Sequence, residues 1–252
     1  MKNYVKISNI INKFNKVINV QGDKSISIRW ALMASQAIGK SRAKNLLKSE
    51  DVDSTLEALK KLGVKVLKNK EYCEIIGKGL NSYNFKNNTT IDAGNSGTLA
   101  RLILGLLSSI NKSIRIKGDK SLSKRDFSRI IKPLNIFGVR IKSNKNKLPV
   151  IIRGTNFLRP IYFEERKGSA QVKSCIMLAS LNTPGKTVIK CINSRDHTER
   201  LFKFLKIPLT VKKLSKTYQL ITIEGKKQYN AFNYNIPGDI SSAAFFIVLT
   251  AL

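Results

Sequence analysis

Three glycine-containing segments place hydroxyl, amide and basic side chains at the predicted starts of helices. They begin at Gly22, Gly94 and Gly168 and read Gly-Asp-Lys-Ser, Gly-Asn-Ser-Gly-Thr and Gly-Ser-Ala-Gln. A glycine turn that opens a helix presents free backbone N–H groups and the positive end of the helix dipole, and both attract anions. One such turn is more often an ordinary helix cap. Three of them in register, each with a basic residue nearby, predict a site for phosphates and carboxylates.

The basic residues close to these turns are spread over the chain: Lys24, Arg29, Arg101, Lys124, Arg125, Lys173 and Arg195. The chain contains neither the Gly-x-x-x-x-Gly-Lys-Ser/Thr run of P-loops nor the Gly-x-Gly-x-x-Gly fingerprint of dinucleotide sites. ATP and nicotinamide cofactors are therefore disfavoured, and no cofactor is predicted.

The single histidine, His197, allows two interpretations. It could act as a general base, or it could orient the start of a helix beside Arg195. We favour the second, because no nucleophile-elbow motif supports a Ser-His-Asp triad. The cysteines Cys73, Cys175 and Cys191 are odd in number and widely spaced, which predicts free buried thiols rather than disulfides or a zinc site.

The glycine turns belong to an internal repeat of about seventy residues. In each copy a helix is followed by a breaker and an alternating strand, with Gly63, Gly138 and Pro208 at the breaks. Each copy then continues into a second strand that closes on a glycine. Because every copy mixes helix and strand, the sequence predicts α/β packing with helices covering sheets, and three copies could pack around a pseudo-threefold axis.

Both ends of the chain lie outside these three copies. A short alternating stretch, Tyr4–Ile7, precedes them. A fourth glycine turn at Gly238 opens an apolar helix, Ser241–Leu252, that has no C-cap and no following strand. We therefore expect a fourth unit to begin there and to be unfinished at Leu252.

The formal net charge of +30 on 252 residues is the strongest bulk signal. It allows a basic nucleic-acid-binding module, because clustered Lys and Arg neutralise phosphates. It also fits an enzyme with a lysine-rich surface that attracts small anions, which we favour because the basic residues are dispersed. No apolar run is long enough for a membrane span or a signal peptide, so a cytoplasmic protein is expected.

Six segments resemble motifs of the EPSP synthases, a family of enolpyruvyl transferases. They lie at 22–29, 93–101, 118–125, 169–174, 194–199 and 238–246. The segments at 169–174 and 194–199 resemble the form of the family that has Ser-Ala-Gln and Arg-Asp-His-Thr. The six motifs occur in order along the whole chain.

The resemblance implies a fold of two similar domains, each built from three βαβαββ units around a pseudo-threefold axis. Residues 21–235 would form one complete domain. Residues 1–20 and 236–252 would belong to the other, which would be incomplete.

The resemblance also implies a reaction in which enolpyruvyl passes from phosphoenolpyruvate to the 5-hydroxyl of shikimate 3-phosphate without a metal. This step belongs to the shikimate pathway of aromatic amino acid biosynthesis. By motif, Ser25 and Arg29 would hold the shikimate ring and its carboxylate. Ser169, the backbone of Ala170, and Arg195 would hold the 3-phosphate. The complete enzyme would act as a monomer.

The remaining substrate contacts follow from the same resemblance. Lys24 would touch both substrates, and Gln171 would lie between them. Asn95 belongs to a substrate-binding motif, and Gly97 and Arg125 would sit on phosphoenolpyruvate.

Two departures qualify the match. Arg125 is followed by Asp-Phe rather than Pro-Met, which puts the register of the next helix in question. The resemblance places the family's acid–base residues beyond Leu252, so we expect no catalytic residue in this chain and little turnover by it alone. The sister enzyme that acts on UDP-N-acetylglucosamine is set aside, because Ser25 follows Lys24 where that enzyme has Asn.

Overall fold

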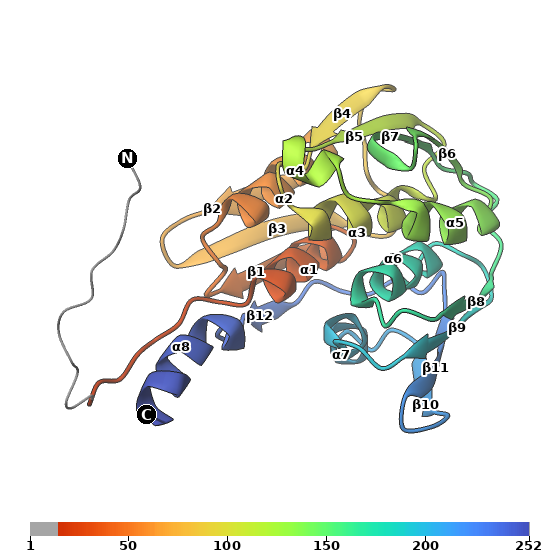
Figure 1. Ribbon diagram of the computed structural model, residues 1–252. Coiled ribbons are helices and arrows are strands. Elements are labelled where there is room, and N and C mark those ends of the chain that lie inside the picture. The colour runs from red at the N-terminus through yellow and green to blue at the C-terminus, as the bar shows by residue number, and fades with distance from the viewer. Residues whose placement is uncertain (1–14, 252) are drawn as a thin grey trace, which may run out of the picture.

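The computed structural model describes residues 15–251 (Figure 1). Two sequence predictions lie outside these residues: the alternating stretch Tyr4–Ile7, and the end of the last helix at Leu252. The structure follows that helix as far as Ala251. The expectation that a fourth unit is unfinished at Leu252 therefore stays a prediction.

The first unit contains α1 (Lys24–Ala34), β1 (Ile38–Lys44), α2 (Glu50–Lys61), β2 (Lys65–Lys68) and β3 (Tyr72–Lys78). The second contains β4 (Thr89–Asp92), α3 (Gly97–Leu107), β5 (Ser113–Lys117), α4 (Lys120–Ser123), α5 (Ser128–Ile136), β6 (Arg140–Asn144) and β7 (Lys147–Arg153). The third contains β8 (Tyr162–Glu165), α6 (Ala170–Ser180), β9 (Lys186–Ile192), α7 (His197–Phe204), β10 (Leu209–Lys213) and β11 (Tyr218–Glu224). The chain continues through β12 (Asn233–Asn235) and α8 (Ile240–Ala251).

The strands form three four-stranded sheets with equivalent strand orders: β12-β1-β3-β2, β4-β5-β7-β6 and β8-β9-β11-β10. In each sheet the first two strands are parallel and the other pairs are antiparallel. The first strand of the first sheet is β12, from the far end of the chain. The three units therefore close into a ring, which confirms the predicted class of βαβαββ units.

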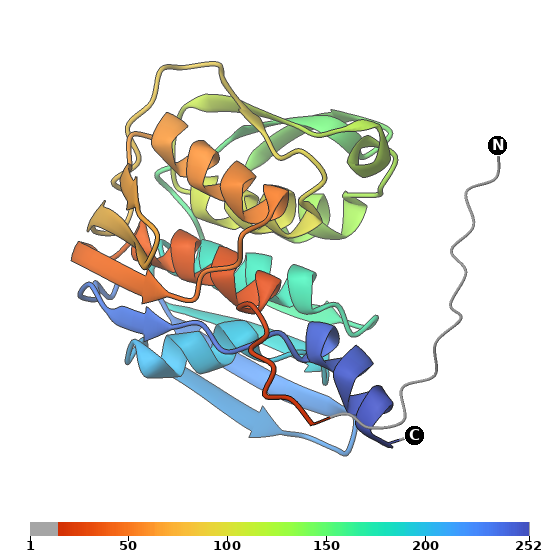
Figure 2. The same ribbon diagram turned by 90° about the vertical axis from the view of Figure 1, so that its left-hand side faces the viewer.

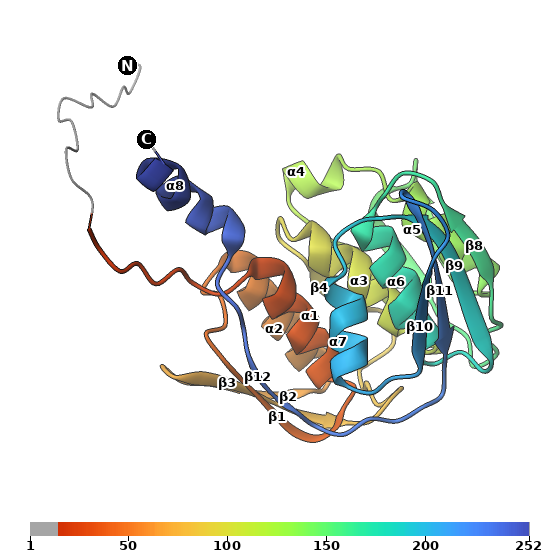
Figure 3. The same cartoon turned by 90° about the horizontal axis from the view of Figure 1, so that it is seen from below.

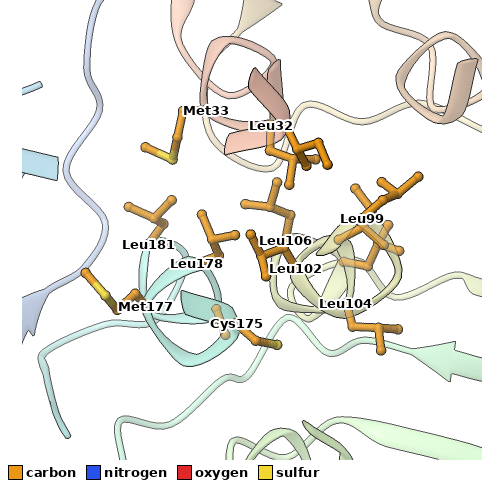
Figure 4. Close-up of a cluster of buried hydrophobic side chains, with 14 of the residues drawn as sticks. Leu32, Met33, Leu99, Leu102, Leu104, Leu106, Cys175, Met177, Leu178 and Leu181 are labelled. Atoms are coloured by element: carbon orange, nitrogen blue, oxygen red, sulfur yellow. The ribbon is translucent and has the colours of Figure 1, made fainter. Parts of the chain in front are cut away.

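Helices fill the space between the sheets (Figures 2 and 3). The first helices of the three units, α1, α3 and α6, are buried on nearly every side, as expected for helices in the centre of a core. Leu32 of α1, Leu102 of α3 and Leu178 of α6 point into one apolar cluster (Figure 4). The sheets face outward, so their strands alternate between buried and exposed residues, as β7 shows.

The breakers that end the second helices work as predicted in two of the three units. Gly63 and Gly138 follow α2 and α5 with φ of 82° and 100°, a left-handed conformation that glycine adopts at little cost. In the third unit Lys206 takes this conformation at φ 54°, two residues before Pro208. Lys206 directly follows the C-cap residue Leu205, just as Gly63 and Gly138 follow the C-cap residues of α2 and α5. A non-glycine residue therefore forms the left-handed turn, and Pro208 lies in the segment before β10.

The two connections at the edge of the ring pair with each other. Gly22 and Gly238 form an isolated antiparallel bridge, and Asp23 N–H donates to the carbonyl of Pro237 at 2.8 Å while Asp239 N–H donates to that of Gln21 at 2.9 Å. Beyond this crossing, α8 has no buried residue and stands apart from the sheets (Figure 1). Within residues 15–251, no helix combines the length and apolarity needed to cross a membrane.

Candidate functional site

The three predicted glycine turns all precede capped helices. Asp23, Ser96 and Ser169 are the N-cap residues of α1, α3 and α6, and each side chain accepts a hydrogen bond from a backbone N–H in the first turn. The starts of α3 and α6 are joined, because Gln171 Nε2 donates to Thr98 Oγ1 at 3.2 Å. Each cap engages one N–H group of its helix. The caps therefore leave the helix dipole and the other backbone N–H groups of the first turn available for anions.

Arg125 lies between α4 and α5 and is oriented by a relay of polar side chains. Asp119 caps α4 through Oδ1 and accepts from Asn95 Nδ2 at 2.7 Å through Oδ2. Asn95 Oδ1 in turn accepts from Arg125 Nη2 at 2.8 Å. The departure after Arg125 has a local role, because Asp126 accepts the N–H of Ser128 at the start of α5.

Arg125 and Arg101 converge above Gly97, the first residue of α3. A Cβ added at Gly97 would lie 2.7 Å from Arg101 Nη1 and 3.0 Å from Arg125 Nη1. Burial, followed by the charges of Arg125 and Arg129, lowers the pKa of Arg101. Two guanidinium groups over a helix N-terminus form a site of concentrated positive charge that favours a bound anion. We refer to Asn95, Gly97, Arg101 and Arg125 as the α3 cluster.

A second cationic cluster joins α1, α6 and α7. Arg29 is 5% exposed, and its guanidinium donates to Thr198 Oγ1 at 2.8 Å, Ser174 Oγ at 3.0 Å and the carbonyl of Ser25 at 3.1 Å. Burial lowers the pKa of Arg29 to about 10. Arg195 precedes α7 and is exposed, and its charge also lowers the pKa of Arg29. We refer to Arg29, Ser174, Arg195 and Thr198 as the α7 cluster.

The only histidine, His197, opens α7 beside this cluster. Burial and then the charge of Arg29 lower its pKa, and Arg195 acts in the same direction. Its Nδ1 is buried and makes no hydrogen bond within residues 15–251. The preferred interpretation, that His197 orients this helix start, stays a prediction.

The loop before α6 is held by a buried carboxylate. Glu165 accepts from the backbone N–H groups of Lys167 at 3.1 Å and Ser169 at 2.9 Å, so Ser169, Ala170 and Gln171 start from a fixed position.

Lys173, which the sequence suggested as a basic residue close to the glycine turn and its anion site, points into the core instead. Its side chain is fully buried and pairs with Glu199, because α6 is covered on nearly every side.

Lys24 is an exposed basic residue that pairs with a single carboxylate. Its Nζ lies 3.2 Å from Oδ2 of Asp51 in the first turn of α2, and about half of its side chain is exposed.

Among the residues predicted from the sequence, the structure brings Asn95, Gly97 and Arg125 together, and it connects Arg29 to α6 and α7. The predictions from the sequence missed Asp51, Asp119, Ser174 and Thr198. Each contacts a candidate site residue that is distant in the chain, and sequence spacing does not reveal such contacts.

All three cysteines are free and buried, as predicted. Burial raises the pKa of the Cys73 thiol to about 11 and also raises those of Cys175 and Cys191. High thiol pKa values leave little thiolate at neutral pH, so these cysteines are packing residues in this part of the molecule.

Solved structures of EPSP synthases and curated proteins named 3-phosphoshikimate 1-carboxyvinyltransferase are similar to this chain. The EPSP synthase of Acinetobacter baumannii superposes with a TM-score of 0.82 and 35% sequence identity, over 92% of this chain and 52% of that one. The 3-phosphoshikimate 1-carboxyvinyltransferase of Ruthia magnifica is 42% identical over 242 residues, which are 96% of this chain and 54% of the relative. That of Vesicomyosocius okutanii is 42% identical over 247 residues and 55% of its length.

The chain therefore spans about half the length of the curated relatives it matches. The family model described as EPSP synthase (3-phosphoshikimate 1-carboxyvinyltransferase) matches residues 8–252. With its ring of βαβαββ units, its ordered motifs and these relatives, the chain belongs to the EPSP synthase family.

Proposed function

We propose that this chain supplies one half of the substrate site of an enzyme that transfers enolpyruvyl from phosphoenolpyruvate to the 5-hydroxyl of shikimate 3-phosphate and releases phosphate. The observation that carries the proposal is the presence of two cationic clusters, one at the start of α3 and one where α1, α6 and the start of α7 meet. Each substrate carries a phosphate and a carboxylate, so two anion sites linked by Gln171 and Thr98 match a pair of such substrates.

Each cluster suits one of the two substrates. In the proposal the α3 cluster binds phosphoenolpyruvate, with Arg125 as its main charge and Gly97 leaving room at the helix start. The α7 cluster, with the start of α6, binds shikimate 3-phosphate: Arg195, Ser169 and the backbone of Ala170 take the 3-phosphate. Ser25 and Arg29 take the ring and carboxylate.

Lys24 serves both substrates in this scheme, because it is exposed and held only by Asp51. The acid–base groups are expected from a segment beyond Leu252, because the relatives are about twice as long as this chain.

We also propose that residues 21–235 form a complete domain, with 1–20 and 236–252 belonging to a second one. The Gly22–Gly238 bridge supports a boundary there. A monomeric cytoplasmic enzyme fits the family resemblance.

Calorimetric titration of the chain with shikimate 3-phosphate tests the proposal. We expect weak but saturable binding, and phosphate release from phosphoenolpyruvate far below a normal enzyme rate. Arg195→Ala should weaken this binding at least tenfold, since hydrogen-bonded charge pairs contribute about 1.5–3 kcal/mol. Arg200→Ala, which removes an exposed arginine paired with Asp196, is the matched control and should bind as the parent does.

A parallel titration with DNA or RNA distinguishes the proposal from a nucleic-acid-binding function. Tight binding of DNA or RNA with a steep dependence on salt, together with no response to shikimate 3-phosphate, would contradict the enzyme assignment. Rapid phosphate release by this chain alone would contradict the expectation that acid–base groups come from elsewhere.

A further inference from the structure

Two buried charges have no place among the proposed substrate contacts. Lys173 of α6 is 0% exposed, Glu199 of α7 is 4% exposed, and Lys173 Nζ lies 2.6 Å from Glu199 Oε1. Although the charges touch, neither group makes a directed hydrogen bond within residues 15–251, and Oε2 of Glu199 is likewise without one. A buried pair with such incomplete hydrogen bonding is a poor source of stability, because desolvation of the two charges offsets their attraction.

The pair lies beside a second contact between the same two helices. Ser174, which follows Lys173 on α6, and Thr198, which precedes Glu199 on α7, share a hydrogen bond of 2.7 Å. Both hydroxyl groups also accept from Arg29. Two adjacent contacts fix how far α7 sits along α6. They therefore fix where Arg195, three residues before Thr198, stands relative to Ser169, the N-cap residue of α6.

Glu199 also acts on Arg29 directly. Its charge raises the pKa of Arg29 against the larger effect of burial, so the carboxylate helps to keep the guanidinium charged. Asp23 acts on Arg29 in the same direction. Glu199 thus helps to order the α7 cluster, in which Arg29 and Arg195 are the two cations.

We propose that Lys173 and Glu199 are a positioning pair that sets the spacing between the start of α6 and the arginines of the α7 cluster. This spacing in turn sets the affinity for the phosphate group of a phosphomonoester. The inference deepens the proposed function and rests on it, since the phosphomonoester is shikimate 3-phosphate. Neither residue touches substrate in this scheme.

The test replaces both members at once, with Lys173→Met and Glu199→Gln. The double change removes one positive and one negative charge, so the net charge is kept and neither member of the pair is left buried without the other. Arg29 loses the nearby charge of Glu199 and keeps its hydrogen bonds to Thr198 and Ser174. We expect affinity for shikimate 3-phosphate to fall about tenfold, because small displacements of binding groups cost that much or more. Lys40→Met with Glu74→Gln is the matched control, because Glu74 is also a buried carboxylate and lies in a different sheet. Its partners are Lys40 and Arg42 of β1, and both of these cations are exposed. The control variant should bind as the parent does.

A second readout needs no substrate. The chain has one histidine, so its imidazole gives one set of NMR signals whose titration reports the pKa of His197. After burial, the charges of Arg29, Asp23, Arg195 and Asp196 shift this pKa most. If the pair positions the arginines, its removal moves the pKa of His197 up toward about 6.5, its ordinary value. The control pair leaves it unchanged.

The outcomes separate the two proposals. If the folded double variant binds shikimate 3-phosphate and titrates His197 as the parent does, the positioning role is wrong. If the parent chain binds no shikimate 3-phosphate, the proposed function fails while the His197 titration still decides the positioning role. Should the double variant fail to fold, Glu199→Asp keeps both charges and withdraws the carboxylate by one methylene. A folded Glu199→Asp chain with parental binding and titration would equally overturn the inference.

Discussion

A methyl group at position 97 would enter the space now shared by two arginines. The clashing atoms are the guanidinium ends of Arg101 and Arg125, at 2.7 and 3.0 Å, and flexible side-chain ends can move aside. Alanine is also a better helix former than glycine by about 1 kcal/mol. We therefore expect Gly97→Ala to leave the thermal midpoint nearly unchanged or slightly raised.

The cost of Gly97→Ala should appear in binding. Displaced arginines weaken the α3 cluster, so we expect affinity for phosphoenolpyruvate, followed by NMR titration, to fall about tenfold. Affinity for shikimate 3-phosphate, which we propose to bind at the α7 cluster, should change little. Equal losses for both ligands, or a large loss of stability, would contradict this account of the two clusters.

Residue types and spacing identified the helix starts of the site, but not the orientation of every side chain there. Ser169 and Gly97 were predictable because caps and glycine turns are local features. The inward direction of Lys173 was not, because an apolar helix buried on nearly every side has no polar face from which to infer one. The relay that orients Arg125 depends on a turn and a helix meeting in space, which spacing alone does not define.

At the scale of elements, the contact between α3 and α6 depends on Gly105. A Cβ at this position would lie 2.4 Å from the carbonyl oxygen of Cys175 and 3.1 Å from Leu178 Cβ. Backbone atoms cannot move aside as side-chain ends can, so the two helices would have to separate. We expect Gly105→Ala to lower the free energy of unfolding by about 2 kcal/mol or more, within the range for overpacked cores.

Chemical denaturation measures this loss, and Gly185→Ala is the control. Gly185 has φ of 80° and only Pro160 near its added Cβ, at 3.6 Å. It should therefore lose only the roughly 1 kcal/mol of a strained backbone. If Gly105→Ala were no worse than Gly185→Ala, the close approach of α3 and α6 would not limit stability.

Most elements of the ring could be predicted, because each repeat carries the same breakers at the same places. The glycine that opens the first helix and the glycine that closes the last strand of each unit are signals of local turn chemistry. The pairing of β12 with β1 could not be predicted, since Asn233–Asn235 are short, polar and remote in sequence from Arg42–Lys44. Pro208 also concealed the left-handed Lys206, because such turns are usually signalled by glycine.

On the scale of the whole molecule, α8 is notable among the described elements for a run of exposed apolar side chains. Phe245 is 80% exposed and Val248 is 57% exposed, and the helix has no buried residue. Contiguous exposed apolar side chains promote association. We expect Phe245→Ser with Val248→Ser to reduce dye binding and concentration-dependent light scattering of this chain. The thermal midpoint should stay the same, because neither side chain contributes to the core.

A matched substitution in the ring is the control for the prediction on α8. Phe157 is 87% exposed but lies in the loop before β8, away from the exposed apolar groups on α8. Phe157→Ser should therefore affect scattering far less. Scattering that falls equally in both variants would attribute association to exposed phenylalanines in general and not to α8.

The bridge between Gly22 and Gly238 bears on whether the ring can be inserted into another protein or circularly permuted. Both ends of the ring meet within one pair of hydrogen bonds, so the segment between them is topologically an insert. It can be spliced into a surface loop of an unrelated carrier, or its ends can be joined and new termini opened elsewhere, without stretching any strand. A circularly permuted ring opened in the Lys145–Asn146 turn would keep β12 beside β1, now as consecutive strands connected through α1.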